Sequence, residues 1–299
     1  MGRMTSSLRL RPHHPVLRRS AESVQFGAGP GGPVELRGGP PALRRLLLGW
    51  RPEQPVEVLL RRAMDAGVPE SEVRSVLTEL HRAGAVVDAA DAVRARAARA
   101  GASVLIAGDG PLRPGLTDSL AMSGVMVGVR GGVSATGRAD LVLLTDGRAG
   151  WGAHADLHRP HLAVRLVDGM GVVGPLVLPR RTACLRCVDL HLTARDPCWP
   201  TVAADLAGRA GSADPATVAA TVALATEQAL AALDALAGAG TPPPTLDAVL
   251  ELDLRRGILD RRHRPPHPDC PCGARHAGSA TPGAEAMCAP STGGRESLS

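Results

Sequence analysis

The sequence reads Thr182-Ala183-Cys184-Leu185-Arg186-Cys187 and, more than eighty residues further on, Cys270-Pro271-Cys272. Each pair of cysteines has the short spacing that lets two thiolates bind one metal ion. Together the pairs supply four soft ligands, which complete a closed tetrahedral site with no open position for water or substrate. The pattern therefore predicts a structural zinc held by Cys184, Cys187, Cys270 and Cys272, which ties two distant segments together.

Free or disulfide-bonded cysteines are the alternative to a zinc site. We expect no secretory signal, because Met1–Leu17 carries arginines but lacks an apolar core of signal-peptide length. Disulfides are rare in the cytoplasm, and Cys-x-Cys is an awkward disulfide partner, so a zinc site is favoured. Cys198 and Cys288 lie outside the pairs, and only Cys198 is close enough in sequence to be a rival ligand.

The composition is biased toward residues with GC-rich codons. The chain has 299 residues and a net charge of +5, and it contains no Lys, Asn or Tyr. The net positive charge therefore reflects codon usage more than it indicates a nucleic-acid-binding surface. The missing residues exclude a Schiff-base lysine, a P-loop lysine and a tyrosine acid. No apolar run approaches about 18 uncharged residues, so we expect a cytoplasmic protein without a membrane span.

Residues 1–90 form a first predicted unit of the α+β kind. Two short strands are expected at Ser23–Phe26 and Val34–Arg37, joined by a turn rich in Gly and Pro. The apolar pattern then predicts three helices and a strand: Pro41–Leu48, Val56–Ala66, Pro69 to Gly84, and Ala85–Asp88. This order is typical of a small winged-helix-like module. An arginine-rich helix, Asp91–Ala100, links it to the rest.

Residues 91–273 have the pattern of an α/β domain. Apolar runs alternate with helical segments at a spacing that implies a parallel, Rossmann-like sheet. The predicted strands are Ser103–Ala107, Val125–Val129, Asp140–Asp146, His161–Val167, Val172–Leu178, Ala248–Leu254 and Gly257–Arg261, and the helices are Pro114–Ser123, Leu185–Thr193 and Asp214–Leu236. Residues 274–299 are rich in Gly, Ala, Ser and Pro, and we expect a disordered tail.

These segments carry a resemblance to a known family. The strand ending in Gly108-Asp109-Gly110, the strand ending in Thr145-Asp146, and Gly174–Val177 before the first cysteine pair resemble the ThiF/MoeB adenylating enzymes of the ubiquitin-activating-like superfamily. More narrowly, Pro179–Trp199 with His267–Cys270 resembles the cyclodehydratase-associated branch. Members of that branch carry an N-terminal winged-helix clamp for leader peptides of ribosomally made, modified peptides. The resemblance implies such a clamp over residues 1–90 and a zinc-bearing ThiF-type domain over 91–273.

The nucleotide site departs from the family pattern. Gly108, Gly110 and Asp146 match ATP-binding positions, but Arg113 stands where a third glycine is expected. The strand ending at Arg130 lacks the acid that holds the ribose, and the family's Asn and Lys are missing. Asp146 matches a magnesium-linked aspartate, although a carboxylate at a strand end is also a common turn former. We expect a degenerate, non-adenylating site, with Asp146 as the one weak catalytic candidate.

Two further clusters have open interpretations. His154, His158 and His161 lie within eight residues, and they indicate either a second metal site or a solvated loop. Arg9, Arg11, Arg18 and Arg19 are either a contact for acidic peptide or a disordered arm.

Three functions are compatible with these features. The first is a scaffold that binds a leader peptide or partner protein, with a YcaO-type cyclodehydratase as partner. The second is an active adenylyltransferase of a ubiquitin-like or sulfur carrier protein, which the missing nucleotide-site residues disfavour. The third is a winged-helix DNA regulator, which Glu70, Glu72 and Glu79 on the expected recognition helix disfavour. The family resemblance also implies a homodimer.

Overall fold

The computed structural model describes residues 8–52, 54–130, 139–145, 157–239 and 241–274. Its N-terminal part consists of short strands and three helices: β1 (Leu8–Leu10), β2 (Val16–Arg18), β3 (Ser23–Phe26), β4 (Val34–Arg37), α1 (Pro41–Leu48), α2 (Val56–Asp65), α3 (Glu70–Arg82) and β5 (Val86–Asp88). β2, β3 and β4 form an antiparallel sheet, and β1 pairs with β5 in a separate antiparallel sheet. We call residues 8–88 the N-terminal unit.

The N-terminal unit has a hydrophobic core of its own. Leu59 on α2 and Val73 and Leu77 on α3 belong to apolar faces with helical spacing, and all three are buried. They cluster with Phe26 of β3, which is the chain's single phenylalanine. The unit therefore has the packing of an independent module. Its winged-helix identity and its boundary at residue 90 stay predictions.

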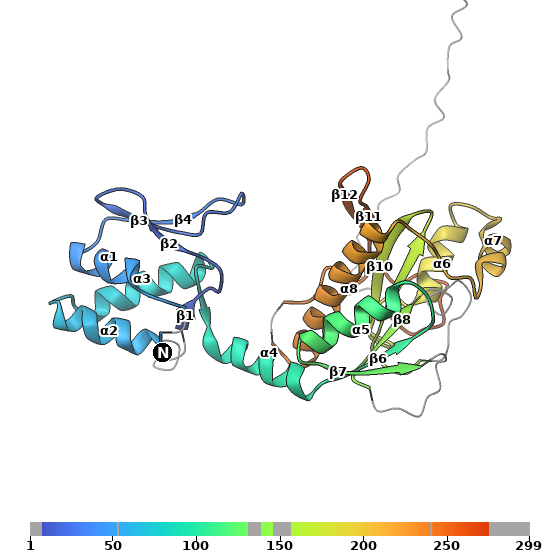
Figure 1. Ribbon diagram of the computed structural model, residues 1–299, viewed down its shortest axis with the longest axis horizontal. Coiled ribbons are helices and arrows are strands. Elements are labelled where there is room, and N and C mark those ends of the chain that lie inside the picture. The colour runs from blue at the N-terminus through green and yellow to red at the C-terminus, as the bar shows by residue number, and fades with distance from the viewer. Residues whose placement is uncertain (1–7, 53, 131–138, 146–156, 240, 275–299) are drawn as a thin grey trace, which may run out of the picture.

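A single helix joins the N-terminal unit to the rest of the fold. This helix, α4 (Ala89–Gly101), begins at Asp88, whose carboxylate caps the first turn by accepting a hydrogen bond from the Ala90 amide. In Figure 1, α4 runs between the two groups of elements, and its C-terminal half approaches the larger one. Arg99 near its end bonds Asp234 of the larger part.

The larger part is built on a seven-stranded mixed sheet. Its strands are β6 (Ser103–Ala107), β7 (Met126–Arg130), β8 (Leu141–Thr145), β9 (His161–Val167), β10 (Met170–Val177), β11 (Ala248–Asp253) and β12 (Ile258–His263). Their order is β12-β11-β10-β9-β8-β6-β7. The four strands β7, β6, β8 and β9 are parallel, whereas β10, β11 and β12 are added in antiparallel hairpins. This confirms the predicted α/β class.

Helices cover both faces of the sheet (Figure 1). One face packs against α5 (Leu112–Met122) and α8 (Pro215–Leu236), with Leu116, Ile106 and Leu143 in one buried cluster. The other face packs against α6 (Leu185–Thr193), whose Leu185 is buried beside Leu144. A further helix, α7 (Trp199–Leu206), packs beside α6. The sheet therefore sits between two helical layers, as expected for a Rossmann-like domain.

The helix α8 bears on the expectation that no segment spans a membrane. Among the described residues it is long and apolar enough, by length and composition, to cross a membrane. As expected from the sequence, it contains no uncharged run of about 18 residues, because Glu227 and Asp234 interrupt it. In the fold, 56% of its most apolar window is buried. The polar side chains of Thr217, Thr221 and Gln228 are buried as well, so α8 has the environment of a core helix.

Two strands and one helix were not expected. β1 holds Arg9, and β2 ends at Arg18, so these arginines lie in sheets and the expectation of a disordered arm was wrong for them. The reason is that Leu8 and Leu10 bury against the core, a signal too short to recognise in isolation. The helix α7 was also missed, and α5 begins at Leu112, ahead of the predicted Pro114. Of the predicted tail, only Ala274 lies within the described residues.

Candidate functional site

The four predicted cysteine ligands converge on one point. The Cys184 Sγ atom lies 3.7 Å from that of Cys187 and 3.6 Å from that of Cys270, and Cys187 Sγ lies 3.7 Å from Cys272 Sγ. All four sulfur atoms lie within 4.8 Å of one another. A tetrahedral zinc with Zn–S bonds of about 2.3 Å separates its sulfur atoms by about 3.8 Å. The cysteines are not disulfide-bonded, and their spacing fits a tetrathiolate metal site.

The first pair is positioned by the loop that joins β10 to α6. The buried Thr182 hydroxyl accepts a hydrogen bond from the Leu178 amide and donates one to the Leu176 carbonyl. Cys184 is the N-terminal flanking residue of α6, and Cys187 lies one turn inside the helix. Both sulfur atoms therefore lie near the positive end of the helix dipole, which favours thiolates.

The second pair follows the β12 strand in a segment bonded back to α6. The His191 Nε2 atom lies 2.9 Å from the Pro265 carbonyl oxygen, and the His191 ring meets the His267 ring edge-on at a centroid distance of 4.9 Å. The Cys270 amide donates to the His267 carbonyl, which closes the turn that carries Cys270 and Cys272. Sequence spacing predicted the ligands, but the supporting role of these histidines required the fold.

The environment favours a thiolate at Cys187. The pKa of Cys187 is lowered to about 4, first because the Cys184 thiol donates a hydrogen bond to it, and further because the His267 backbone amide donates another. The same contact raises the pKa of Cys184, since its proton is shared with Cys187. A preformed thiolate is the state that binds metal. The donor set is therefore chemically suited to zinc, which would supply a structural cross-link and no reactive position.

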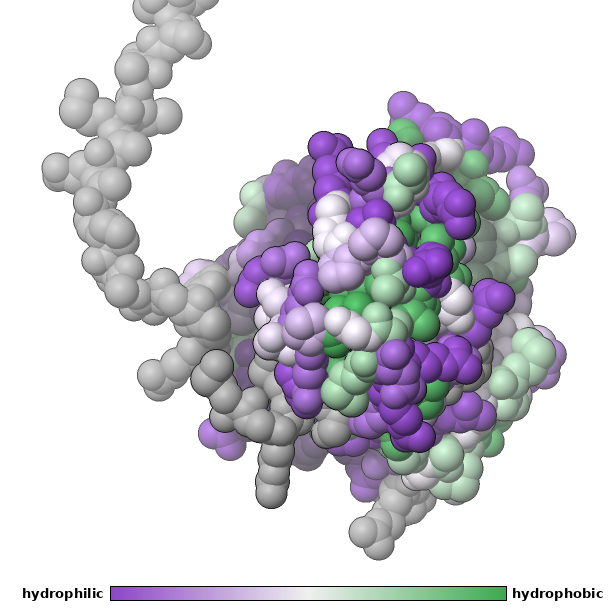
Figure 2. All heavy atoms as spheres, turned by 90° about the vertical axis from the view of Figure 1, so that its left-hand side faces the viewer, coloured by the Kyte–Doolittle hydropathy of each residue, from purple (hydrophilic) through white to green (hydrophobic). Residues whose placement is uncertain are grey.

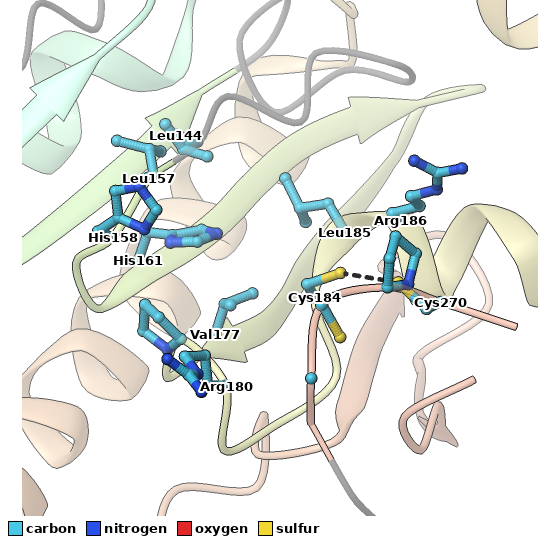
Figure 3. A pocket seen from close by; sticks show the side chains of 14 residues that line it. Leu144, Leu157, His158, His161, Val177, Arg180, Cys184, Leu185, Arg186 and Cys270 are labelled. Carbon is cyan, nitrogen blue, oxygen red and sulfur yellow. Dashed lines mark hydrogen bonds between the residues drawn. The ribbon is translucent and has the colours of Figure 1, made fainter. Parts of the chain in front are cut away.

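A cavity of about 540 Å³ opens beside the cysteine cluster. Figure 3 shows His158 and His161 on the opposite side from Cys184 and Cys270, with Leu144 and Val177 along the wall. Arg180 and Arg186 also line this cavity, and no acidic side chain is among its described lining residues. These two guanidinium groups therefore give the cavity a positively charged lining.

The structure describes only two members of the predicted histidine cluster, His158 and His161. His158 and His161 line the cavity, and the Nδ1 atom of His161 lies 2.8 Å from the Arg159 carbonyl oxygen. His154 lies outside the described residues. Within the described chain, the cysteine cluster is the group with metal-binding geometry, and no second group includes these histidines.

Cys198 is not brought to the metal site. It is exposed at the start of α7, and its amide donates a hydrogen bond to the Asp196 carboxylate. The four-cysteine cluster does not include it. Cys288 lies outside the described residues.

The nucleotide-type loop follows β6 at the point where the strand order reverses. β6 pairs with β7 on one side and with β8 on the other, which is where doubly wound sheets bind ligands. Gly108 and Gly110 in this loop have φ angles of 127° and 136°, which disfavour other residues. A Cβ atom on Gly108 would lie 2.3 Å from the Thr145 carbonyl oxygen. Close packing against β8 therefore accounts for Gly108 without any nucleotide.

Two charged residues of this loop pair with each other. Arg113, which stands where the third glycine of the motif is expected, forms an ion pair with Asp109. Gly115 instead lets α5 approach α8 closely. A Cβ atom added at Gly115 would lie 3.0 Å from a Val222 methyl group on α8. Sequence comparison with the glycine motif missed Gly115 because it lies two positions too late. Asp146 lies outside the described residues.

Comparisons with known proteins find likeness in structure and none in sequence. No protein-family model matches the chain, and no curated protein matches it. The heterocyclase TruD matches with a TM-score of 0.66 and 17% identity, over 90% of this chain and 43% of that chain. A heterocyclase in complex with substrate and cofactor matches with a TM-score of 0.67 and 16% identity, over 90% of this chain and 40% of that one.

A third match covers the whole of the other protein. E. coli MccB with AMPCPP and selenomethionine MccA has a TM-score of 0.62 and 11% identity, over 90% of this chain and 100% of that chain. The fold is similar to that of MccB and to that of the matched part of these heterocyclases. The likeness is one of fold alone, and the ThiF-like, cyclodehydratase-associated family assignment stays a prediction. The chain spans about two fifths of the length of the two heterocyclases.

Proposed function

We propose that this chain is a non-adenylating scaffold of modified-peptide biosynthesis, which binds a peptide and presents it to a separately encoded enzyme. The observation that carries the proposal is the structural match to the heterocyclase TruD. The chain aligns over 90% of its own length with the heterocyclase TruD but spans only 43% of that protein. The match therefore corresponds to part of that heterocyclase, and we propose a cyclodehydratase of the YcaO type as the partner of this chain.

The state of the nucleotide loop supports the non-adenylating part of the proposal. Gly108 is needed for packing against Thr145, and Asp109 is already paired with Arg113. Adenylyl transfer needs cationic groups around the phosphates, and the chain has no Lys. Active adenylation of a carrier protein remains the second candidate, because MccB with AMPCPP has the same fold.

The N-terminal unit supports peptide binding. Among the described strands, β4 pairs only with β3, so its outer edge presents backbone groups that an extended peptide can pair with. Seen from the side of this unit, apolar residues gather near the middle of the face and hydrophilic residues surround them (Figure 2). Such a rimmed apolar patch is typical of protein-interaction surfaces. We propose a leader peptide of the modified substrate as the occupant.

The zinc and the quaternary structure complete the proposal. We propose that a zinc ion in the four-cysteine site links α6 to the segment after β12. This link keeps the larger part of the fold rigid while it contacts the partner. We propose that the protein works in the cytoplasm as a homodimer. The third candidate, DNA regulation, is disfavoured because α3 carries Glu70, Glu72 and Glu79 where a recognition helix needs positive charge.

Reconstitution tests the proposal. The full chain is mixed with a YcaO-type enzyme and a precursor peptide encoded beside it, and ATP-dependent loss of water from the peptide is followed by mass spectrometry. We expect modification only when all three components are present, and a stable complex of chain and peptide in the absence of ATP. Peptide binding should disappear when residues 1–90 are removed, while the zinc content stays unchanged. Modification at the same rate without the chain would reject the scaffold function.

A further inference from the structure

A second hollow lies in the N-terminal unit, far in sequence from the cysteine cluster. It measures about 320 Å³ and lies between α1 and the connection from β2 to β3. Its charged and polar lining residues are Arg18, Arg44, Arg45, Ser20 and Ser23. Val24 and Leu48 add apolar surface. The hollow therefore combines three guanidinium groups, two hydroxyl groups and an apolar edge.

The positive charge of this hollow is not neutralised by the described part of the chain. Arg44 donates hydrogen bonds to the backbone carbonyls of Gly38, Gly39 and Ala21, which hold its guanidinium group in place but carry no formal charge. Among the residues that the structure describes, no acidic side chain lines the hollow. Within the described ranges, neither Arg18 nor Arg45 forms an ion pair with an acidic side chain. These cations are therefore available for an external anion.

The charge of the whole unit is divided between its two halves. Residues 8–48, which supply β1 to β4 and α1, contain seven arginines and two glutamates. Residues 49–88, which supply α2, α3 and β5, contain five arginines and seven acidic residues. One of the two glutamates in the first half, Glu35, is already paired with Arg19 and Arg37. The excess positive charge is thus concentrated on the side that contains the hollow.

We infer that the hollow is a carboxylate-binding subsite for a Glu or Asp side chain of the peptide that this unit binds. The inference rests on the proposed peptide-binding function and adds the chemical class of its ligand. Guanidinium groups bind carboxylates through strong charge-assisted hydrogen bonds. The edge formed by Val24 and Leu48 suits the methylene groups of an acidic side chain in an extended peptide. A nucleic acid fits less well, because the acidic helix α3 belongs to the same unit.

Fluorescence anisotropy with the full-length protein tests the subsite. The probes are a short labelled peptide of alternating Leu and Glu, the same peptide with Gln in place of Glu, and a labelled DNA duplex. The double variant Arg18→Gln/Arg45→Gln removes the two cations that are available for an anion. It leaves Arg44, which donates hydrogen bonds to backbone carbonyls, unchanged. The matched control, Arg61→Gln/Arg62→Gln, removes the same charge from two exposed positions on α2. Zinc content and thermal unfolding verify that both variants are folded.

We expect the Glu peptide to bind on the order of tenfold more tightly than the Gln peptide, as one charge-assisted contact implies. That preference should vanish in the Arg18/Arg45 variant and persist in the control. Equal binding of the two peptides, equal loss in both variants, no binding of either peptide, or tighter binding of the duplex would each overturn the subsite. Binding of both peptides with equal affinity would still support peptide binding by the unit, so the two proposals fail separately.

Discussion

Arg99 on α4 and Asp234 on α8 form a two-point ion pair, with Nε 2.8 Å from Oδ1 and Nη2 2.5 Å from Oδ2. The hydrogen bonds that Arg99 donates to the Asp234 carboxylate raise the pKa of Arg99, so its guanidinium group stays charged. It links residues 135 positions apart and attaches the connecting helix to the central helix of the larger part. The ion pair thereby fixes the end of α4 on the sheet domain.

The first prediction concerns this ion pair. Arg99→Gln should lower the free energy of unfolding of the sheet domain by about 1 kcal/mol, because a charge-assisted pair is lost but its arginine is partly exposed. Urea unfolding measures the change. Arg96→Gln removes an equal charge from an exposed position on the same helix and should have almost no effect. Equal effects of the two substitutions would show that the ion pair adds nothing to the free energy of unfolding.

The second prediction is one tightly bound zinc per chain. Cys187→Ser and Cys272→Ser should each lose the metal and unfold at lower temperature, because the site ties α6 to the segment after β12. Metal analysis of purified protein measures the content. Cys198→Ser is the matched control and should keep its zinc, since Cys198 is exposed and outside the cluster. Full zinc content in both ligand variants would remove the assignment.

The third prediction is that the chain alone does not exchange pyrophosphate into ATP. The parts needed for adenylation act as a unit, and of these the sequence retains only Gly108, Gly110 and Asp146. Calorimetry should detect weak ATP binding or none, and Asp146→Ala should leave partner binding almost unchanged. Robust exchange that disappears in the Asp146→Ala variant would restore the enzyme hypothesis.

The fourth prediction separates packing from backbone strain in the β6–α5 loop. Gly108→Ala should destabilise the protein by about 3 kcal/mol or more, because the new Cβ would lie 2.3 Å from a backbone oxygen of Thr145 at a positive φ. Gly124→Ala also has a positive φ but meets nothing within 4 Å, and should cost about 1 kcal/mol. Thermal unfolding compares the two variants. Equal costs would mean that Gly108 is retained for another reason, such as access of a phosphate.

The fifth prediction is a homodimer formed through the larger part. Related folds commonly assemble as symmetric pairs, and the groove between α5 and α8 offers the small apolar residues Ala219 and Ala223 for close approach of a second copy. Sedimentation at micromolar concentration should show a dimer. Replacing Ala219 with Glu should shift it toward monomer without loss of zinc. A monomer at all concentrations in the unchanged protein would contradict the prediction.

The spacing of residues along the chain was sufficient for several features. The pairs Cys184/Cys187 and Cys270/Cys272 predicted a four-ligand cluster, since the ligands of structural zinc sites typically come in short-spaced pairs. Apolar runs such as Ser103–Ala107 and His161–Val167 predicted buried strands, and both occur with those bounds. These are local signals, because a strand or a metal-binding loop is encoded by residues that are neighbours in sequence.

Other features depend on contacts between residues far apart in sequence. Gly108 is explained by Thr145 and Gly115 by Val222, and no pattern within either loop indicates these partners. Burial likewise turns α8 into a core helix, although its composition alone allows a membrane span. Arg18 and Arg45 meet around one hollow only because β2 packs on α1. Close approach, burial and shared charge are properties of packed surfaces, so tertiary structure was needed to establish them.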